Sequence, residues 1–157
     1  QMLERGSGWV VTVNSPISQW AWPGALGYGA ARWGLRGLDE CLALDLRGTG
    51  IGVSAVVAGH TESEYFGSNP GSLDRMPSLD RYVRRLSPDD VAAMIVRAVE
   101  EERRHVTEPM QIRVVNATAR LWPGLVARVT SATGAQRRDR SHTSRTSTKP
   151  RTAKPAT

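Results

Sequence analysis

Residues 9–13 read Trp-Val-Val-Thr-Val (WVVTV), a short run of apolar and β-branched side chains between Gly8 and Asn14. Because the run has no alternating polar face, it predicts a strand in a sheet that is covered on both sides. Residues 51–57 (IGVSAVV) form a second run of this kind, and we expect a third, shorter strand at residues 105–109 (HVTEP). These three segments decide the fold, since the stretches between them predict helices and loops.

The stretches between the predicted strands carry helical patterns. Apolar residues recur at helical spacing over residues 28–47, and Gly-Thr-Gly at 48–50 ends that helix. A second helix, over residues 87–104, begins with a capping serine, a proline in the first helical position and two acids in the first turn. Residues 110–130 are largely apolar and are interrupted by Pro-Gly at 123–124.

Strands that alternate with helices predict an α/β fold, here part of a doubly wound, Rossmann-type parallel sheet of about three strands with flanking helices. We expect the crossovers between these strands to be right-handed. Residues 1–133 carry this pattern. Residues 134–157 contain almost no apolar side chains and are rich in Ser, Thr, Arg and Pro, so we expect a disordered basic tail there.

The net charge of +6 is concentrated in that tail. From Gln136 onward the sequence has seven basic residues against one acid, so the remainder of the chain carries no net charge. The surface of the folded part is therefore not expected to be predominantly basic. Two interpretations of the tail stay open: it binds nucleic acid or anionic lipid through phosphate contacts, or it is an extension without function. We rank nucleic-acid binding below the enzymatic interpretation developed next.

The composition also excludes several classes. The single cysteine, Cys41, excludes an internal disulfide and a cysteine-based metal site, and its place in an apolar helical pattern predicts a buried thiol. No apolar run approaches the ~18 residues of a membrane span. No basic segment followed by an apolar core opens the sequence, so we expect a cytoplasmic protein without a membrane span.

Three polar side chains around the first strand and helix could carry chemistry. Ser15 directly follows the first strand, so its hydroxyl lies at the carboxyl edge of the predicted sheet, where open α/β sheets bind ligands. Tyr28 and Arg32 are four residues apart and share one face of the next helix. A permanent cation beside a phenol favours the phenolate, as proton transfer at neutral pH requires. A serine hydroxyl can hydrogen-bond a substrate oxygen on which charge develops.

Three blocks of the sequence, in order, resemble one known family. VTVNSPIS at 11–18 resembles the strand-end pattern VNxSSxxS, and YGAARWGLRGL at 28–38 resembles the helix pattern YxASKxAL. AGHTES at 58–63 stands where that family has PGxxxT. In this order and spacing, the chain resembles the short-chain dehydrogenase/reductases from residue 1 to about residue 130.

The resemblance implies an NAD(P)-dependent oxidoreductase that transfers hydride between a nicotinamide and the carbon of a carbonyl or alcohol substrate. It implies that Tyr28 is the general acid/base, that Arg32 assists it and holds the ribose, and that Ser15 positions the substrate oxygen. The residues implied to contact the cofactor, NAD or NADP, are Asn14, Tyr28, Arg32, Gly59, Thr61 and Ser63.

The sequence departs from the family pattern at three places. Arg32 replaces the family's lysine, which we expect to weaken catalysis, because a forked guanidinium is not equivalent to an ammonium at a geometric site. Ala58 replaces the turn proline. The glycine-rich TGxxxGxG turn, the adenine-pocket acid and the NNAG segment occur nowhere in the 157 residues. Without that turn the helix-terminus cradle for a pyrophosphate is lacking.

From these departures we expect a C-terminal half whose cofactor-binding N-terminal half is absent, and which is inactive as it stands. We expect such a chain to form a homo-oligomer or to depend on a separate N-terminal half, because the first strand would otherwise leave an open edge. The alternative is a non-catalytic fragment or interaction module that acts through its basic tail or its open sheet edge.

Four further features lie near the predicted site. His60 could contact substrate, but the interpretation we favour is a solvated loop histidine. Residues 65–86 correspond to the family's substrate lid or to plain loop structure, and Trp20 and Trp22 border the site or simply pack. For residues 110–130 we favour a sheet-edge cover or an oligomer contact over a helix lying on a membrane surface.

Overall fold

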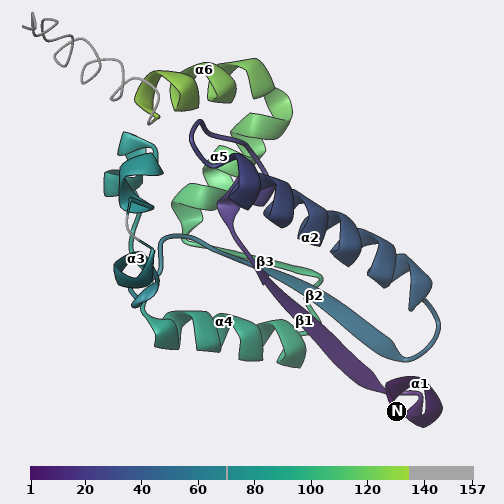
Figure 1. Cartoon of the computed structure of the whole chain (residues 1–157). Coiled ribbons are helices and arrows are strands. Elements are labelled where there is room, and N and C mark those ends of the chain that lie inside the picture. The colour runs from purple at the N-terminus through teal and green to yellow at the C-terminus, as the bar shows by residue number, and fades with distance from the viewer. Residues whose placement is uncertain (70, 135–157) are drawn as a thin grey trace, which may run out of the picture.

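The computed structural model describes residues 1–69 and 71–134, and it shows a parallel sheet between helices (Figure 1). The strands are β1 (Gly8–Asn14), β2 (Ile51–Ala58) and β3 (His105–Glu108), and they pair in the order β1-β2-β3. Both pairings are parallel. The predicted α/β class and all three predicted strands are confirmed within one residue at each end.

The main helices also lie where the sequence predicts them. The helix predicted to reach residue 104 ends earlier, at Glu100, and the apolar stretch from residue 110 splits into two helices at Trp122. The break at Trp122 follows from the local sequence, since Pro123 opens a new helix and cannot continue the old one. The helices are α1 (Met2–Arg5), α2 (Leu26–Asp45), α3 (Tyr65–Ser68), α4 (Pro88–Glu100), α5 (Met110–Leu121) and α6 (Pro123–Thr133), with single 3-10 turns at Pro16–Ser18, Leu73–Arg75 and Ser78–Tyr82.

The two faces of the sheet are covered by different helices. Figure 1 shows α2 and α5 on one face and α4 on the other. Along β2, Val56 packs in the core beside Met94 of α4, while its neighbours Ala55 and Val57 line a small cavity with Asp39 of α2. This alternation is the period of two of a strand, and it places apolar residues on both faces. The expected double cover is therefore confirmed.

The handedness of the crossovers differs from expectation. The strands step in one direction, from β1 to β2 to β3, yet α2 and α4 lie on opposite faces of the sheet. The two crossovers must therefore have opposite hands, and the one through α4 is left-handed in Figure 1. The right-handed preference arises because a strand that leads directly into a helix packs back onto the sheet with that hand. The connection through residues 59–87 is long enough to lead around the carboxyl edge to the other face.

The main core lies between the sheet and α4. Leu86, Met94 and Ala98 are almost fully buried against Val56 and Val106. The start of α4 is fixed by a capping box, in which the Ser87 hydroxyl accepts from the Asp90 N–H at 3.0 Å and the Asp90 carboxylate accepts from the Ser87 N–H at 2.9 Å. The predicted cap is thus confirmed.

Helix α2 turns a different face inward from the one its apolar pattern suggested. Leu38 is 54% exposed and Cys41 is also exposed, so the predicted buried thiol is wrong. The inward position is taken by Asp39, which is 1% exposed and accepts a hydrogen bond of 2.6 Å from the Thr12 hydroxyl of β1. Apolar residues lie all around this helix, so their spacing alone does not define which side packs on the sheet.

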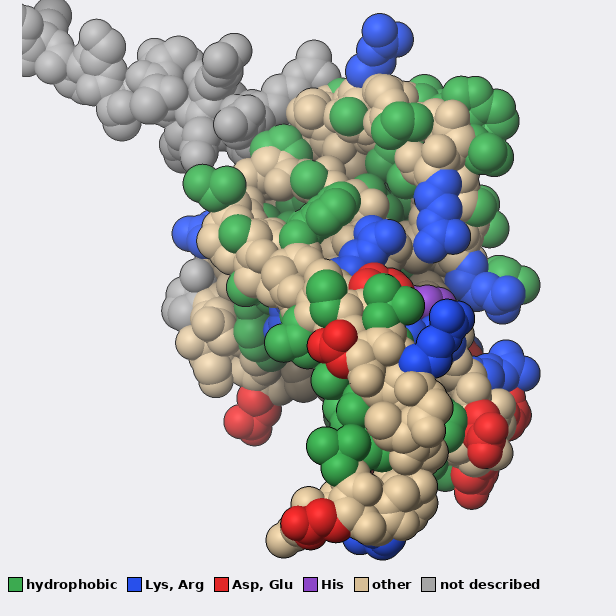
Figure 2. All heavy atoms as spheres, turned by 90° about the vertical axis from the view of Figure 1, so that its right-hand side faces the viewer, with side chains coloured by type: hydrophobic (Ala, Val, Ile, Leu, Met, Phe, Trp, Pro, Cys, Tyr) green, Lys and Arg blue, Asp and Glu red, His purple; other side chains and the backbone are tan. Residues whose placement is uncertain are grey.

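Strand β1 is only half-buried, not fully buried as its sequence suggested. Among the described residues it pairs on one side only, with β2, and Val13 near its end is 41% exposed. Apolar side chains of α2 such as Leu44 are also exposed. Figure 2 views the molecule from the right-hand side of Figure 1 and shows hydrophobic side chains at several places on that surface. An unpaired apolar strand edge invites further pairing.

Within the described residues no helix is both long and apolar enough to cross a membrane. The predicted disordered tail lies outside the described residues, and so do the interpretations attached to its charge.

The pH dependence of the stability of the fold tests the capping box. Hydrogen bonding from the Ser87 N–H, aided by the Arg84 guanidinium 3.0 Å away, lowers the pKa of Asp90 below its usual value of 3.8. A lowered folded-state pKa means that the stabilisation is present above the usual pKa and is lost as the pH falls through the lowered one. We therefore expect Asp90→Asn to destabilise the fold near neutral pH, and the difference from the wild type to shrink as the pH falls below the usual value of 3.8 and to vanish below the lowered pKa.

Urea denaturation across pH measures this difference. Asp89→Asn is the matched control, because Asp89 lies in the same helical turn but its side chain bonds no other described residue. A wild-type profile that coincides with that of Asp90→Asn at every pH would contradict the assignment.

Candidate active site

The predicted site residues come from three chain segments that meet at the carboxyl edge of the sheet. Strand β1 ends at the first segment, α2 begins at the second, and the third follows β2. All of these residues line one pocket of about 780 Å³. The residues brought together are Asn14, Ser15, Tyr28, Arg32, Gly59, Thr61 and Ser63.

The start of α2 is fastened to the end of β1 by Arg32. Its guanidinium donates to the carbonyl oxygen of Val13 at 3.2 Å, and its own carbonyl accepts from the side-chain amide of Asn14 at 3.2 Å. The guanidinium carbon also lies 5.0 Å from the ring centroid of Tyr28, which is 36% exposed. Arg32 therefore holds a fixed positive charge beside an accessible phenol.

The backbone around Ser15 is organised by its neighbours. The buried Asn14 side chain accepts from the Ser15 N–H at 2.8 Å, and the Ser15 carbonyl accepts from the Ser18 hydroxyl at 2.7 Å. The Ser15 hydroxyl itself makes no hydrogen bond to another described residue. It lines the pocket with its donor and acceptor capacity available to a ligand.

The turn after β2 depends on a glycine. A Cβ atom at Gly59 would lie 2.8 Å from Cδ of Pro109, so a larger residue would push apart the ends of β2 and β3. The Gly59 N–H donates to the carbonyl of Glu108 at 2.9 Å, and the Thr61 hydroxyl donates to the Gly59 carbonyl at 3.2 Å. This turn thus presents hydroxyl side chains at a fixed place on the pocket wall.

The segment that follows, residues 62–85, borders the pocket, and its two ends lie close together. Thr61 and Leu86 form an isolated parallel bridge, in which Leu86 donates to the His60 carbonyl at 2.9 Å and accepts from Glu62 at 2.8 Å. Residues 62–85 therefore leave and return at one point. Such a closed excursion fits both interpretations of residues 65–86, a substrate lid and plain loop structure, and residues 62–85 are called the lid below.

His60 is part of this wall, and the solvated histidine favoured from the sequence is wrong. The residue is 6% exposed, its Nδ1 lies 2.7 Å from the Asp80 carboxylate, and its ring centroid is 4.6 Å from that of Phe66. The pair joins the base of the lid to its interior. No local pattern links His60 to a residue twenty positions later, so only the folded chain reveals it.

Aromatic side chains form another wall. Trp20 and Trp22 have ring centroids 5.2 Å apart, and both line the pocket. The Trp20 indole N–H donates to the Asn116 side chain of α5 at 2.9 Å. This bond ties the loop before α2 to the C-terminal helices, so the aromatic pair is held in place rather than free on the surface.

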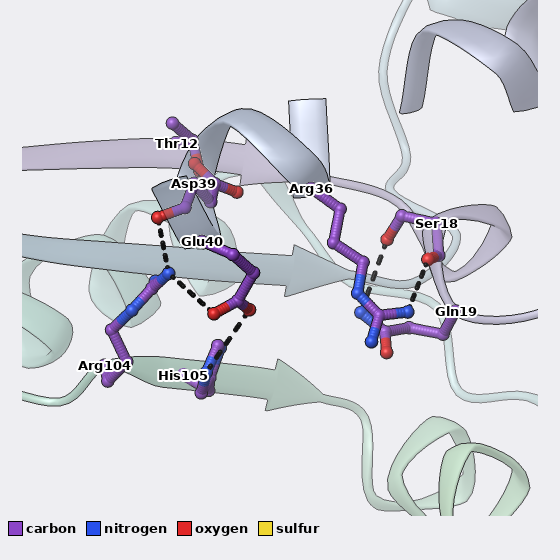
Figure 3. A network of polar contacts seen from close by, with 8 residues as sticks. All are labelled: Thr12, Ser18, Gln19, Arg36, Asp39, Glu40, Arg104 and His105. Carbon is purple, nitrogen blue, oxygen red and sulfur yellow. Dashed lines mark hydrogen bonds and ion pairs between the residues drawn. The ribbon is translucent and has the colours of Figure 1, made fainter. Parts of the chain in front are cut away.

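Beneath α2 a polar network fastens the helix to the sheet (Figure 3). The Arg104 guanidinium donates to the Asp39 carbonyl at 2.7 Å and lies 3.5 Å from Glu40, and Arg36 donates to the Ser18 carbonyl at 3.0 Å. Burial lowers the pKa of His105 at the edge of this network, and the Arg104 charge lowers it further, so the imidazole is neutral at pH 7. The network positions α2, and therefore Tyr28, on the sheet.

Residues 1–69 and 71–134 contain no cluster of three or more His, Cys, Asp or Glu side chains that could hold a metal ion.

Comparison with known proteins identifies similar sequences and folds. The family model for short chain dehydrogenase matches residues 1–71. A 3-oxoacyl-[acyl-carrier-protein] reductase of Thermotoga maritima is 30% identical over 111 residues, covering 68% of this chain and 44% of that protein. Sulfoacetaldehyde reductase 2 of Chromohalobacter salexigens is 32% identical over 96 residues, covering 60% of this chain and 38% of that protein. The chain thus spans about two fifths of the length of these relatives.

Solved structures give the same fold. A short-chain dehydrogenase of Burkholderia cenocepacia, in complex with NADP, superposes with a TM-score of 0.63 at 14% identity, over 79% of this chain and 47% of that one. A short-chain dehydrogenase of Sphingobium yanoikuyae, in complex with NADPH, superposes with a TM-score of 0.59 at 18% identity, over 99% of this chain and 52% of that one. The fold and the pocket at the sheet's carboxyl edge define the doubly wound α/β class. Within that class, the chain belongs to the short-chain dehydrogenase/reductase family.

The contact between His60 and Asp80 generates a second test. Asp80→Ala removes the carboxylate partner and leaves a buried imidazole nitrogen without one, which costs about 1–3 kcal/mol. We expect the lid to open more often and trypsin to cleave after Arg75 and Arg81 about tenfold faster, as a local opening cost of about 1.4 kcal/mol predicts.

Mass spectrometry of timed digests measures the cleavage. Asp74→Ala is the control, because Asp74 is exposed on the same segment and its side chain bonds no other described residue. Equal cleavage rates in the two variants would show that the His60 contact does not hold the lid.

Proposed function

We propose that this chain carries the catalytic side chains of an NAD(P)-dependent oxidoreductase that interconverts a carbonyl and an alcohol. The observation that supports the proposal is the convergence of Ser15, Tyr28 and Arg32 on one pocket at the carboxyl edge of the sheet. The order and spacing of these residues in the sequence agree with the family pattern.

In the reducing direction, the Tyr28 hydroxyl donates its proton to the substrate oxygen as the carbonyl becomes an alcohol. The Ser15 hydroxyl donates a hydrogen bond to the same oxygen and stabilises the negative charge that develops on it. Arg32, fixed at 5.0 Å from the Tyr28 ring, stabilises the phenolate left behind. Oxidation runs the same proton transfer backwards.

A nicotinamide cofactor supplies or accepts the hydride in this proposal. Its nicotinamide end fits the polar part of the pocket, where Asn14, Thr61 and Ser63 offer amide and hydroxyl groups and Gly59 leaves the backbone accessible. Arg32 has guanidinium donors for a ribose hydroxyl. The turn that would cradle a pyrophosphate is not among the 157 residues.

We also propose that residues 1–133 form the C-terminal part of a larger doubly wound sheet. Alone, the 157 residues have the groups for the nicotinamide end but lack a phosphate cradle. We therefore expect no measurable dehydrogenase activity and only weak binding of NADH or NADPH in calorimetric titration. Micromolar affinity for either cofactor would overturn the expectation.

The catalytic assignment is tested in the longer protein if the gene encodes an in-frame TGxxxGxG segment upstream of Gln1. In that protein Tyr28→Phe removes the proton donor and should lower kcat/KM by about 10²–10⁴-fold. Arg32→Lys should raise kcat, because the ammonium restores the family's geometry. Tyr82→Phe is the control, since Tyr82 is exposed and lies outside the pocket lining. Equal loss in both tyrosine variants would refute the role of Tyr28.

The half-paired β1 generates a further prediction. With one edge and several α2 side chains exposed, the isolated chain should self-associate, because unpaired N–H and C=O groups on an apolar strand template pairing with a second copy. Analytical ultracentrifugation measures the association. A monodisperse monomer across a hundredfold concentration range would show that the edge is protected.

A further inference from the structure

The walls of the pocket differ sharply in polarity. The polar side chains come from the ends of β1 and β2 and from the start of α2, where the proposed chemistry takes place. The other walls come from the tryptophan loop, the lid and α6. Among the apolar side chains that these walls contribute are Trp22, Phe66, Leu79, Val126 and Val129.

Charge is scarce in these apolar walls. Asp80 is the one carboxylate among the described lining residues, and its Oδ2 already pairs with Nδ1 of His60. Arg32 lies at the polar end of the pocket, where its charge is assigned to Tyr28 and the ribose, and Arg75 is exposed to solvent. The described lining therefore provides no buried charged partner for a strongly ionic substrate.

The size of the pocket supports the same conclusion. The whole pocket measures about 780 Å³, in the upper part of the range for sites that enclose drug-sized ligands, and the proposed nicotinamide end takes up only its polar part. A two- or three-carbon carbonyl compound would leave the apolar walls in contact with water. A larger apolar body would cover them, and covering them contributes binding free energy in proportion to the buried area.

We infer that the substrate is a bulky, largely apolar ketone or secondary alcohol whose single oxygen lies at Ser15 and Tyr28 and whose body lies against the tryptophan loop, the lid and α6. The inference deepens the proposed function, on which the assignment of the reactive oxygen rests. The apolar binding itself does not require the cofactor.

The test is a homologous series of methyl ketones, from butan-2-one to dodecan-2-one, titrated into the 157-residue chain without cofactor. Isothermal titration calorimetry gives Kd for each ketone. We expect Kd to fall by about fourfold per added methylene until the pocket is filled. If Kd did not depend on the length of the ketone's carbon chain, the inference would be refuted.

Two variants locate the binding. Leu79→Asp on the lid and Val129→Asp on α6 each place a carboxylate in the apolar walls. Each variant should bind decan-2-one at least about tenfold more weakly, while the Kd of butan-2-one changes little. Both positions are partly exposed, at 43% and 37%, so the substitutions are compatible with folding. Leu38→Asp, 54% exposed and outside the lining, is the matched control. Unchanged affinity in both test variants would place the ketone elsewhere and refute the inference.

The experiment separates this inference from the proposed function. Chain-length-dependent binding in the isolated chain, without NAD(P)H turnover of the same ketones in the longer protein, would refute the oxidoreductase but leave an apolar ligand site. Turnover of butan-2-one as efficient as that of decan-2-one would support the oxidoreductase and refute the bulky substrate.

Discussion

The parallel pairing of β1 with β2 is the constraint on which the rest of the structure depends. It sets Asn14 opposite Val57, so the residues that follow the two strands emerge at one edge of the sheet. Ser15 lies after the first strand, and the turn at 59–63 follows the second. Segments more than forty residues apart thereby face one pocket, and every proposed role relies on that register.

Helix α2 carries the tyrosine, and polar contacts rather than apolar packing alone hold it on the sheet. Thr12 binds the buried Asp39, Arg104 binds the carbonyl of the same residue, and Arg32 reaches the end of β1. Hydrogen bonds of this kind are directional, so they fix the rotation of the helix as well as its position. A fixed rotation holds the Tyr28 hydroxyl in one direction, as the proposed proton donation requires.

The lid and the C-terminal helices give the pocket its depth. They converge on it from different directions, tied down by the Asp80 contact with His60 and by the bond from Trp20 to Asn116. These ties link segments distant in the chain, and the side chains around them are mostly apolar. The polar edge and the apolar walls are therefore built by separate parts of the sequence, so that in the proposed function the walls can set specificity without altering the polar edge.

The sequence by itself determined the three strands, the helices between them and the grouping of Ser15, Tyr28 and Arg32, because these follow from local periodicity, caps and short spacings. Only the tertiary structure decided the inward face of α2, the exposure of Cys41, the left-handed second crossover and the burial of His60. The inward face of α2, the exposure of Cys41 and the burial of His60 each depend on which distant side chain occupies the facing position, and the left-handed crossover depends on the path of the long connection through residues 59–87. Local spacing contains no information about that partner, so the folded arrangement alone selects it.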